Sequence, residues 1–405
     1  MNRGFYIILA AQFLSALADN ALLFAAIALL KEISAPDWHV PLLQQFFIIS
    51  YILLAPFVGP YADSMPKGRV MFVTNFVKLA GCLAMLAGMP PLYAYAIVGL
   101  GAAAYSPAKY GILTEYLPSR ELVKANSWME GATVAAIVLG TVIGSQMTDL
   151  KLTGAALRNW GLDAWLGVPQ FAIVVIVLLY LGAAWFNLHI PAVAIDHRPP
   201  RKNPVFLLYD FWHSFKLLWK DPLGQVSLAV TTLFWGVGAT LRFVVLAWAA
   251  FNLKFDPTHA GYLTAVVAVG IAVGAAIAGK WVKLESSVKV LPAGIILGVT
   301  VITMIFVTDW RIAAVLLFFI GVLSGFFVVP LNALLQHRGH LLMGAGHSIA
   351  IQNFNENLGI LILLGAYTFM VGNGVHIHWV IVTFGLFISL AMTVIWRRHR
   401  DDQVH

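Results

Sequence analysis

Polar side chains follow one face of the first hydrophobic segment. Gln12, Ser15 and Asp19 are spaced i, i+3 and i+7, so they share one side of an α-helix, and Asn20 adjoins Asp19. A carboxylate at membrane depth is costly unless it faces a cation or a cavity. Asp19 is therefore a candidate ligand for an ammonium group or a coupling cation. A structural salt bridge to another helix is the alternative.

Basic residues lie inside other hydrophobic segments, where their charge also needs a partner. Lys109 ends the sequence YSPAK, just after the helix-disrupting Pro107, and Arg242 lies deep in a later segment. Arginine and lysine both bind phosphate well, so we expect Arg242, and with it Lys109, to receive an anionic group. Lys109 could instead extend to the membrane surface. Lys78 fits a structural role better.

Acidic and amide residues gather in the segment around residue 355. Gln352 and Glu356 are four residues apart, and so are Asn353 and Asn357, which gives two adjacent polar stripes. The stripes are wider than packing alone requires, so we expect this segment to line a site for a polar headgroup. Glu130, in an earlier segment, is either a further member of that site or one half of an ion pair.

Catalytic and metal-binding patterns do not occur in the sequence. No aspartate stands five residues after any of the 12 histidines, so the H-x4-D pattern of glycerolipid acyltransferases is missing, as is a G-x-S-x-G nucleophile elbow. His376 and His378 are spaced wrongly for one helix face, and Cys82 is the only cysteine. We therefore expect neither an enzyme nor a bound cofactor or metal.

The elements that position these residues are predicted to be membrane-spanning helices. Hydrophobic residues make up 60% of the 405 and charged residues only 11%, against about 25% in soluble domains. A helix crosses the bilayer with about 20 apolar residues. The apolar runs predict twelve helices, over residues 5–31, 42–63, 70–88, 92–113, 127–148, 167–189, 225–251, 259–281, 289–308, 311–334, 344–370 and 377–396.

The loops between these helices are unevenly charged. Of the 25 Lys and Arg residues, 17 fall on the side that would hold both termini and 5 on the other, which predicts cytoplasmic termini. The net charge of +7 thus reflects membrane orientation, and we expect no nucleic-acid partner. The predicted organisation is an N-terminal six-helix bundle (1–190), a cytoplasmic linker with a basic, aromatic, amphipathic stretch (191–224), and a C-terminal bundle with a short basic tail (225–405).

The loop after the second helix reads GPYADSMPKGR over residues 59–69. It resembles the conserved loop motif of the major facilitator superfamily, an all-α fold of twelve helices in two six-helix bundles. In that family the aspartate meets a neighbouring helix N-terminus and holds the two halves in one state. The resemblance implies that Asp63 has this gating role, together with Lys67 and Arg69. A solvated turn with cytoplasmic charges is the alternative.

Several longer stretches carry a closer resemblance. They look like the bacterial lysophospholipid transporters of that superfamily, in both halves of the chain. The resemblance implies import of lysophosphatidylethanolamine and related lysolipids from the outer to the inner leaflet of the bacterial inner membrane. It also implies functional coupling to an acyltransferase and acyl-carrier-protein synthetase that reacylates them. The stretches are AQFLSALADNALLF (11–24), GAAAYSPAKYGIL (101–113), LVKANSWMEGATVAAIVLG (122–140), LFWGVGATLRF (233–243), GFFVVPLNALLQHRG (325–339) and AGHSIAIQNFNENLG (345–359).

A proton-coupled exporter of drugs or small amphiphiles is the alternative within the same superfamily. Asp19 and Glu356 could then be proton sites. Against it, Lys109 and Arg242 favour a substrate with an anionic group. A lysolipid also needs apolar walls for its acyl chain, since each exposed CH₂ costs about 0.8 kcal/mol. The sequence does not distinguish proton, sodium or no ion coupling.

Overall fold

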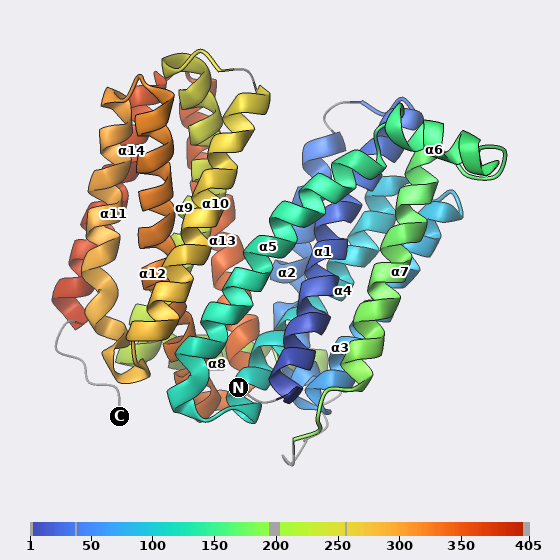
Figure 1. Cartoon of the computed structure of the whole chain (residues 1–405). Helices are drawn as coiled ribbons and strands as arrows, with labels where there is room; N and C mark the ends of the chain where they lie inside the picture. The colour runs from blue at the N-terminus through green and yellow to red at the C-terminus, as the bar shows by residue number, and fades with distance from the viewer. Residues whose placement is uncertain (1–2, 37–38, 194–202, 256, 400–405) are drawn as a thin grey trace. The chain divides into compact units, whose positions relative to one another are not determined.

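The computed structural model describes residues 3–36, 39–193, 203–255 and 257–399. This part of the chain is helical throughout, with short 3₁₀ segments at Ser119–Glu121, Leu284–Val290 and Met304–Phe306 (Figure 1). The α-helices are α1 (Arg3–Glu32), α2 (His39–Asp63), α3 (Lys67–Leu86), α4 (Pro91–Tyr116), α5 (Leu122–Met147), α6 (Leu152–Trp160), α7 (Val168–Leu188), α8 (Pro204–Lys220), α9 (Pro222–Asn252), α10 (Pro257–Trp281), α11 (Leu291–Thr303), α12 (Trp310–Met343), α13 (Ala345–Gly372) and α14 (Ile377–His399).

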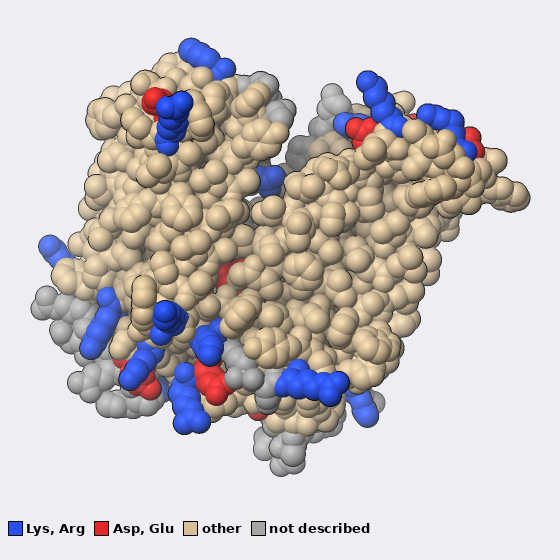
Figure 2. All heavy atoms as spheres, in the orientation of Figure 1, with Lys and Arg blue, Asp and Glu red and all other residues tan. Residues whose placement is uncertain are grey.

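The prediction of an all-helical polytopic membrane protein is confirmed. Within the described residues, 11 helices are long and apolar enough to cross a membrane, and each coincides with a predicted span. The remaining prediction, 92–113, corresponds to α4, which has 26 residues but is less apolar because it carries Lys109 and Glu115. Figure 2 agrees with a lipid environment, since on the face shown charged residues gather toward the helix ends of each unit.

The C-terminal end of one helix departs from the prediction for a physical reason. The span predicted to end at residue 334 continues to Met343 as α12, because Gln336 is buried and hydrogen-bonded and Arg338 is ion-paired within unit 2. Gln336, for example, exchanges two hydrogen bonds of 2.8 Å with Asn126. His337 and His340 both lie within α12, which ends before Gly344.

One helix was not predicted at all. The short α6 follows α5 and ends where Gly161 adopts a left-handed conformation, with φ of 68°. It buries Thr153, Gly154 and Leu157 and exposes Trp160. It is too short to cross a membrane, and its apolar residues were too few to resemble a span.

The linker prediction is only partly within the described residues. Residues 194–202, which include most of the DHRPPRKNP stretch, lie outside them. The amphipathic stretch that follows forms α8, with Phe211 and Leu218 buried and Tyr209 and Trp212 exposed. Its location on the membrane surface stays a prediction, as does the organisation by chain order with boundaries after residues 190 and 224.

The helices cluster into two compact units, described here one at a time. Unit 1 holds Met1–Glu115, Ala135–Phe211 and Ala345–Ala350, and unit 2 holds Tyr116–Val134, Trp212–Gly344 and Ile351–His405. The core of unit 1 is formed by α1, α2, α3, α4 and α7, with small residues such as Ala18, Ala21 and Ala25 fully buried along α1. Small side chains allow helices to approach closely where lipid offers no hydrophobic driving force.

Unit 2 contains a close crossing of α10 and α12 built on glycine. Gly270 and Gly274 on α10 meet Gly321 and Gly325 on α12, and each helix thus presents a small-xxx-small face. A Cβ atom added at Gly274 would collide with the carbonyl oxygen of Val322. The two backbones are therefore in direct contact at this crossing.

Candidate functional site

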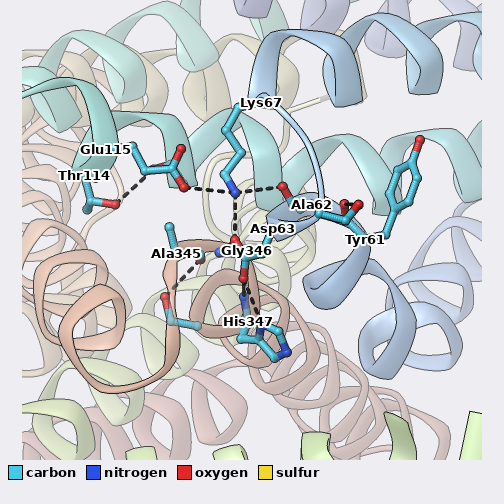
Figure 3. Close-up of polar contacts among 12 residues, drawn as sticks. Tyr61, Ala62, Asp63, Lys67, Thr114, Glu115, Ala345, Gly346 and His347 are labelled. Atoms are coloured by element: carbon cyan, nitrogen blue, oxygen red, sulfur yellow. Dashed lines mark hydrogen bonds and ion pairs between the residues drawn. The ribbon is translucent and has the colours of Figure 1, made fainter. Parts of the chain in front are cut away.

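The predicted gating loop forms a cluster of polar contacts within unit 1 (Figure 3). Asp63, the last residue of α2, accepts hydrogen bonds from the backbone N–H groups of Gly346, at 2.8 Å, and His347, at 3.1 Å. These N–H groups belong to the first turn of α13, where they have no partner within the helix and where the helix dipole favours an anion. Asp63 is thus bound to a helix N-terminus that lies 283 residues away in the chain.

Lys67 completes the cluster from the first turn of α3. Its ammonium group lies 2.7 Å from Asp63, 3.0 Å from Glu115 at the end of α4, and 2.7 Å from the carbonyl oxygen of Ala62. The side chain is buried, with only 3% of the residue exposed. Two carboxylates therefore share one buried cation, which joins α2, α3 and α4.

The structure brings together two of the three residues predicted for gating, and the gating role itself stays a prediction. Asp63 and Lys67 are brought together, because Pro66 starts α3 so that the pair is spaced i, i+4. Arg69 is exposed, and its side chain makes no hydrogen bond or ion pair with the described residues. Glu115 and His347 were missed. No sequence signal pairs His347 with Asp63, because the two residues are 284 positions apart.

Asp19 occupies a second polar cluster in unit 1. The Lys78 ammonium group donates to both oxygens of Asp19, at 2.9 and 2.8 Å, and to the Ser15 hydroxyl at 2.9 Å. The Tyr180 hydroxyl donates to Asp19 at 2.6 Å. Lys78 is 1% exposed and also lies over the Tyr105 ring, 4.6 Å from its centroid. Lys78 thus has the partner that a structural role requires. The salt bridge considered as the alternative for Asp19 is the contact between Asp19 and Lys78.

The side chain of Asp19 is nevertheless 22% exposed, whereas the side chain of Lys78 is 1% exposed. The other two residues of the predicted polar stripe, Gln12 and Ser15, are buried on the same helix. The Ser15 hydroxyl donates to Asn75 at 3.0 Å. Asn20, in contrast, donates to the carbonyl oxygen of Ala16 in its own helix.

The polar stripes of α13 form a hydrogen-bonded network in unit 2. The Gln352 amide donates to Asn332 on α12 at 2.8 Å and to Glu356 at 2.7 Å. The amide of Asn355 donates to Thr232 on α9 at 2.8 Å. Asn357 donates to the carbonyl oxygen of Asn353 at 2.8 Å, within the helix.

Glu130 also belongs to this region of unit 2. It is 4% exposed and Glu356 is 7% exposed, and the two carboxyl groups lie close enough to interact electrostatically. Two buried acids in one neighbourhood repel each other when both are charged, so one of them gains by binding a proton or a cation.

The two predicted phosphate ligands belong to different units. Lys109 in α4 is half-buried in unit 1, with its ammonium group 4.4 Å from the centroid of the Tyr110 ring. Arg242 in α9 is exposed in unit 2, and its guanidinium has no hydrogen bond or ion pair with the described residues. Arg242 is thus an exposed cation within a candidate membrane-spanning helix.

An ionic contact that the sequence analysis did not consider fixes the start of α9. The Asp221 carboxylate caps the helix by accepting from the backbone of Gly224 at 2.8 Å, and Arg338 of α12 donates to both of its oxygens. Burial would raise the pKa of Asp221, but the hydrogen bonds from Arg338 and Gly224 hold that pKa below its usual value. This pair orients α9, the helix that carries Arg242.

The comparisons with known proteins agree with this architecture. Residues 8–362 match the model of the Major Facilitator Superfamily, and the chain belongs to that family. It is therefore a multi-pass transporter of this superfamily and not an enzyme.

Within the superfamily, the chain is similar to lysophospholipid transporters. It is 44% identical over 402 residues to "Lysophospholipid transporter LplT" of Escherichia coli O1:K1 / APEC, which covers 98% of this chain and 97% of that protein. The LplT of Enterobacter sp. (strain 638) is also 44% identical, over 396 residues, with 98% and 96% covered. The predicted resemblance to this transporter family is confirmed.

Solved structures show the same fold at low sequence identity. FucP, a Major Facilitator Superfamily transporter solved in the outward conformation, matches with a TM-score of 0.76 at 14% identity over 99% of each chain. The human organic anion transporter MFSD10 (TETRAN) matches with a TM-score of 0.71 at 13% identity, covering 97% of this chain and all of that one.

Proposed function

We propose that this protein is a lysophospholipid flippase that moves lysophosphatidylethanolamine and related lysolipids from the outer to the inner leaflet of the bacterial inner membrane. The observation that carries the proposal is the 44% identity with LplT across 98% of the chain. Similarity at this level covers the helices that hold every candidate substrate residue. The product would then be open to reacylation by an acyltransferase and acyl-carrier-protein synthetase on the cytoplasmic side.

Two charged positions support recognition of a zwitterionic headgroup. Arg242 has no internal partner within the described residues, and a guanidinium binds the two oxygens of a phosphate in a fork. The partly exposed Asp19 carboxylate can accept a further donor beside Lys78, as the ammonium of an ethanolamine would require. Asn20, Lys109, Glu130 and the α13 residues Gln352, Asn353, Glu356 and Asn357 are proposed as further polar contacts.

The apolar part of the substrate has a physical requirement of its own. An acyl chain transferred through water would lose about 0.8 kcal/mol for each CH₂ group, so it must stay against apolar surface. The charged and amide residues of α1, α9 and α13 interrupt otherwise apolar helices. A headgroup can therefore be held by polar side chains while its tail remains among apolar side chains or lipid tails.

The gating cluster supports an alternating mechanism. Asp63 binds the N-terminus of α13 through backbone N–H groups, and Lys67 and Glu115 hold Asp63 in place. We infer that this contact forms in one state of the transport cycle and opens in another, with Arg69 at its periphery. We infer from the excess of Lys and Arg in these loops that this cluster and both termini are cytoplasmic.

Reconstitution in liposomes tests the proposed function. Labelled lysophosphatidylethanolamine added to the outside should become inaccessible to an external quencher faster than in empty liposomes. Arg242→Gln should slow this step by about tenfold or more, since one charge-assisted contact to phosphate is lost. Arg311→Gln, an exposed arginine at the start of α12, is the matched control and should leave the rate unchanged. Flipping at the rate of empty liposomes by the folded protein would refute the proposal.

A further inference from the structure

The imidazole of His347 lies between two carboxylates from different elements. Its Nδ1 atom is 2.7 Å from an oxygen of Asp63 at the end of α2, and its Nε2 atom is 3.3 Å from an oxygen of Asp210 in α8. All three residues belong to unit 1, and only 19% of the His347 side chain is exposed. The first turn of α13, the gating loop and the helix after the linker therefore meet at one side chain.

The hydrogen-bonding capacity of these groups restricts the protonation state. An ionised carboxylate only accepts hydrogen bonds, and a neutral imidazole carries a single N–H donor. A neutral His347 can thus serve one of the two aspartates and must turn a nitrogen lone pair toward the other. The imidazolium ion has a donor on each nitrogen and serves both contacts at once.

The charges around the imidazole favour the same form. Asp63 and Asp210 face it directly, and beyond Asp63 lie Lys67 of α3 and Glu115 of α4. These four groups carry three negative charges and one positive charge. A proton on His347 reduces the excess negative charge of a cluster that is largely removed from water, so cluster formation and proton binding stabilise each other.

We propose that His347 is a proton-binding site that clamps α8 and the Asp63 loop to the start of α13, so that opening of this gate depends on pH. Protonation holds the clamp closed. The contribution is present at low pH and is lost as the pH rises through the titration of the imidazole, which ordinarily occurs near pH 6.5. His347 acts here as a positioning residue, because it bears on transport through the contact of Asp63 with the helix N-terminus.

Thiol labelling measures the clamp without any substrate. In a Cys82→Ala background, Ser64→Cys places a single reporter thiol in the loop next to Asp63. The measured quantity is the ratio of the labelling rate at pH 8 to the rate at pH 5.5. We expect this ratio to be about tenfold larger in the protein with His347 than in His347→Asn, which is the scale of one charge-assisted contact. The His347→Asn variant keeps a hydrogen-bond donor but has no group that titrates at this position. Both proteins carry the same reporter thiol, so comparing them removes the ordinary pH dependence of thiol reactivity.

Two further variants make the outcome decisive. Asp210→Asn removes the second carboxylate and should reduce the pH dependence even if His347→Asn does not fold. His213→Asn replaces an exposed histidine on the same helix and should leave the profile unchanged. A labelling profile that is identical in His347→Asn or Asp210→Asn and in the unaltered protein would overturn the proposal.

The expected effect of the clamp on lysolipid flipping rests on the proposed function and is measured in a separate assay. The pH profile of lysolipid flipping should flatten in His347→Asn, whereas a merely structural loss would lower the rate equally at every pH. An unaltered protein that shows the labelling profile but flips no lysolipid would sink the proposed function and leave the clamp standing. A flipping rate with the same pH profile in both proteins would overturn the clamp as a regulator.

Discussion

At the scale of single residues, charges at membrane depth separate into those that have a partner and those that have none. Asp19 is satisfied by Lys78 of α3 and Tyr180 of α7. Arg242 has no such partner among the described residues. A buried ion pair holds helices in register, whereas an unpaired cation can recognise a ligand, so the two kinds of charge predict different phenotypes.

The Asp19–Lys78 pair should respond strongly to single substitutions. Lys78→Met leaves the Asp19 carboxylate without its cation, and we expect a loss of stability on the order of a few kcal/mol. Asp19→Asn should be milder, because its partner can still donate to Ser15. The double variant should recover part of the stability lost in Lys78→Met, which thermal unfolding in detergent would measure.

The double variant also separates structure from substrate binding. If Asp19 serves only the ion pair, the refolded double variant should flip lysolipid at the normal rate. We expect it to remain slow, because the carboxylate proposed to receive the ammonium group is gone. Additive effects on stability, with no recovery in the double variant, would contradict the contact between the two side chains.

At the scale of elements, the sequence located helices better than it located their ends. The predicted ends failed where polar residues continue a helix, as in α12, where Gln336 finds Asn126. The short α6 was missed, since a helix of 9 residues leaves no membrane-spanning signal. Hydropathy reports whether a segment can be buried in lipid, and it says little about polar residues that are buried against another helix.

The glycine crossing of α10 and α12 gives a prediction for one element pair. Gly274→Leu must push the two helices apart, since no side-chain atom fits against the Val322 carbonyl oxygen. We expect most of the protein to be lost as aggregate. Gly261→Leu, on the same helix, adds a side chain where nothing lies within 4 Å and is the matched control. Size-exclusion chromatography in detergent would compare them, and equal yields would show that the crossing tolerates separation.

At the scale of the whole molecule, the distribution of basic residues predicts how the chain is inserted. Loops that carry most of the Lys and Arg residues should be cytoplasmic, together with both termini. In a Cys82→Ala background, Glu285→Cys and Asp149→Cys therefore should report from opposite sides of the membrane, since both positions are exposed.

Labelling of intact cells with a thiol reagent that does not cross the membrane measures this topology. We expect Asp149→Cys to react from outside and Glu285→Cys to react only after the cells are opened. Reaction of both positions in intact cells would contradict the predicted topology, because three predicted spans, 167–189, 225–251 and 259–281, separate the two positions and should put them on opposite sides. Reaction of Glu285→Cys alone would show the reverse orientation.

The sequence by itself determined that this chain is a helical membrane transporter, which residues lie at membrane depth and which family it resembles. These are local properties, set by apolar runs of about 20 residues and by short motifs. Which polar groups meet was decided by the tertiary structure alone. Lys78 and Asp19 are 59 residues apart, and Asp63 and His347 are 284 apart. Such pairs depend on how each helix is rotated, and that rotation follows from the close packing of small residues between helices.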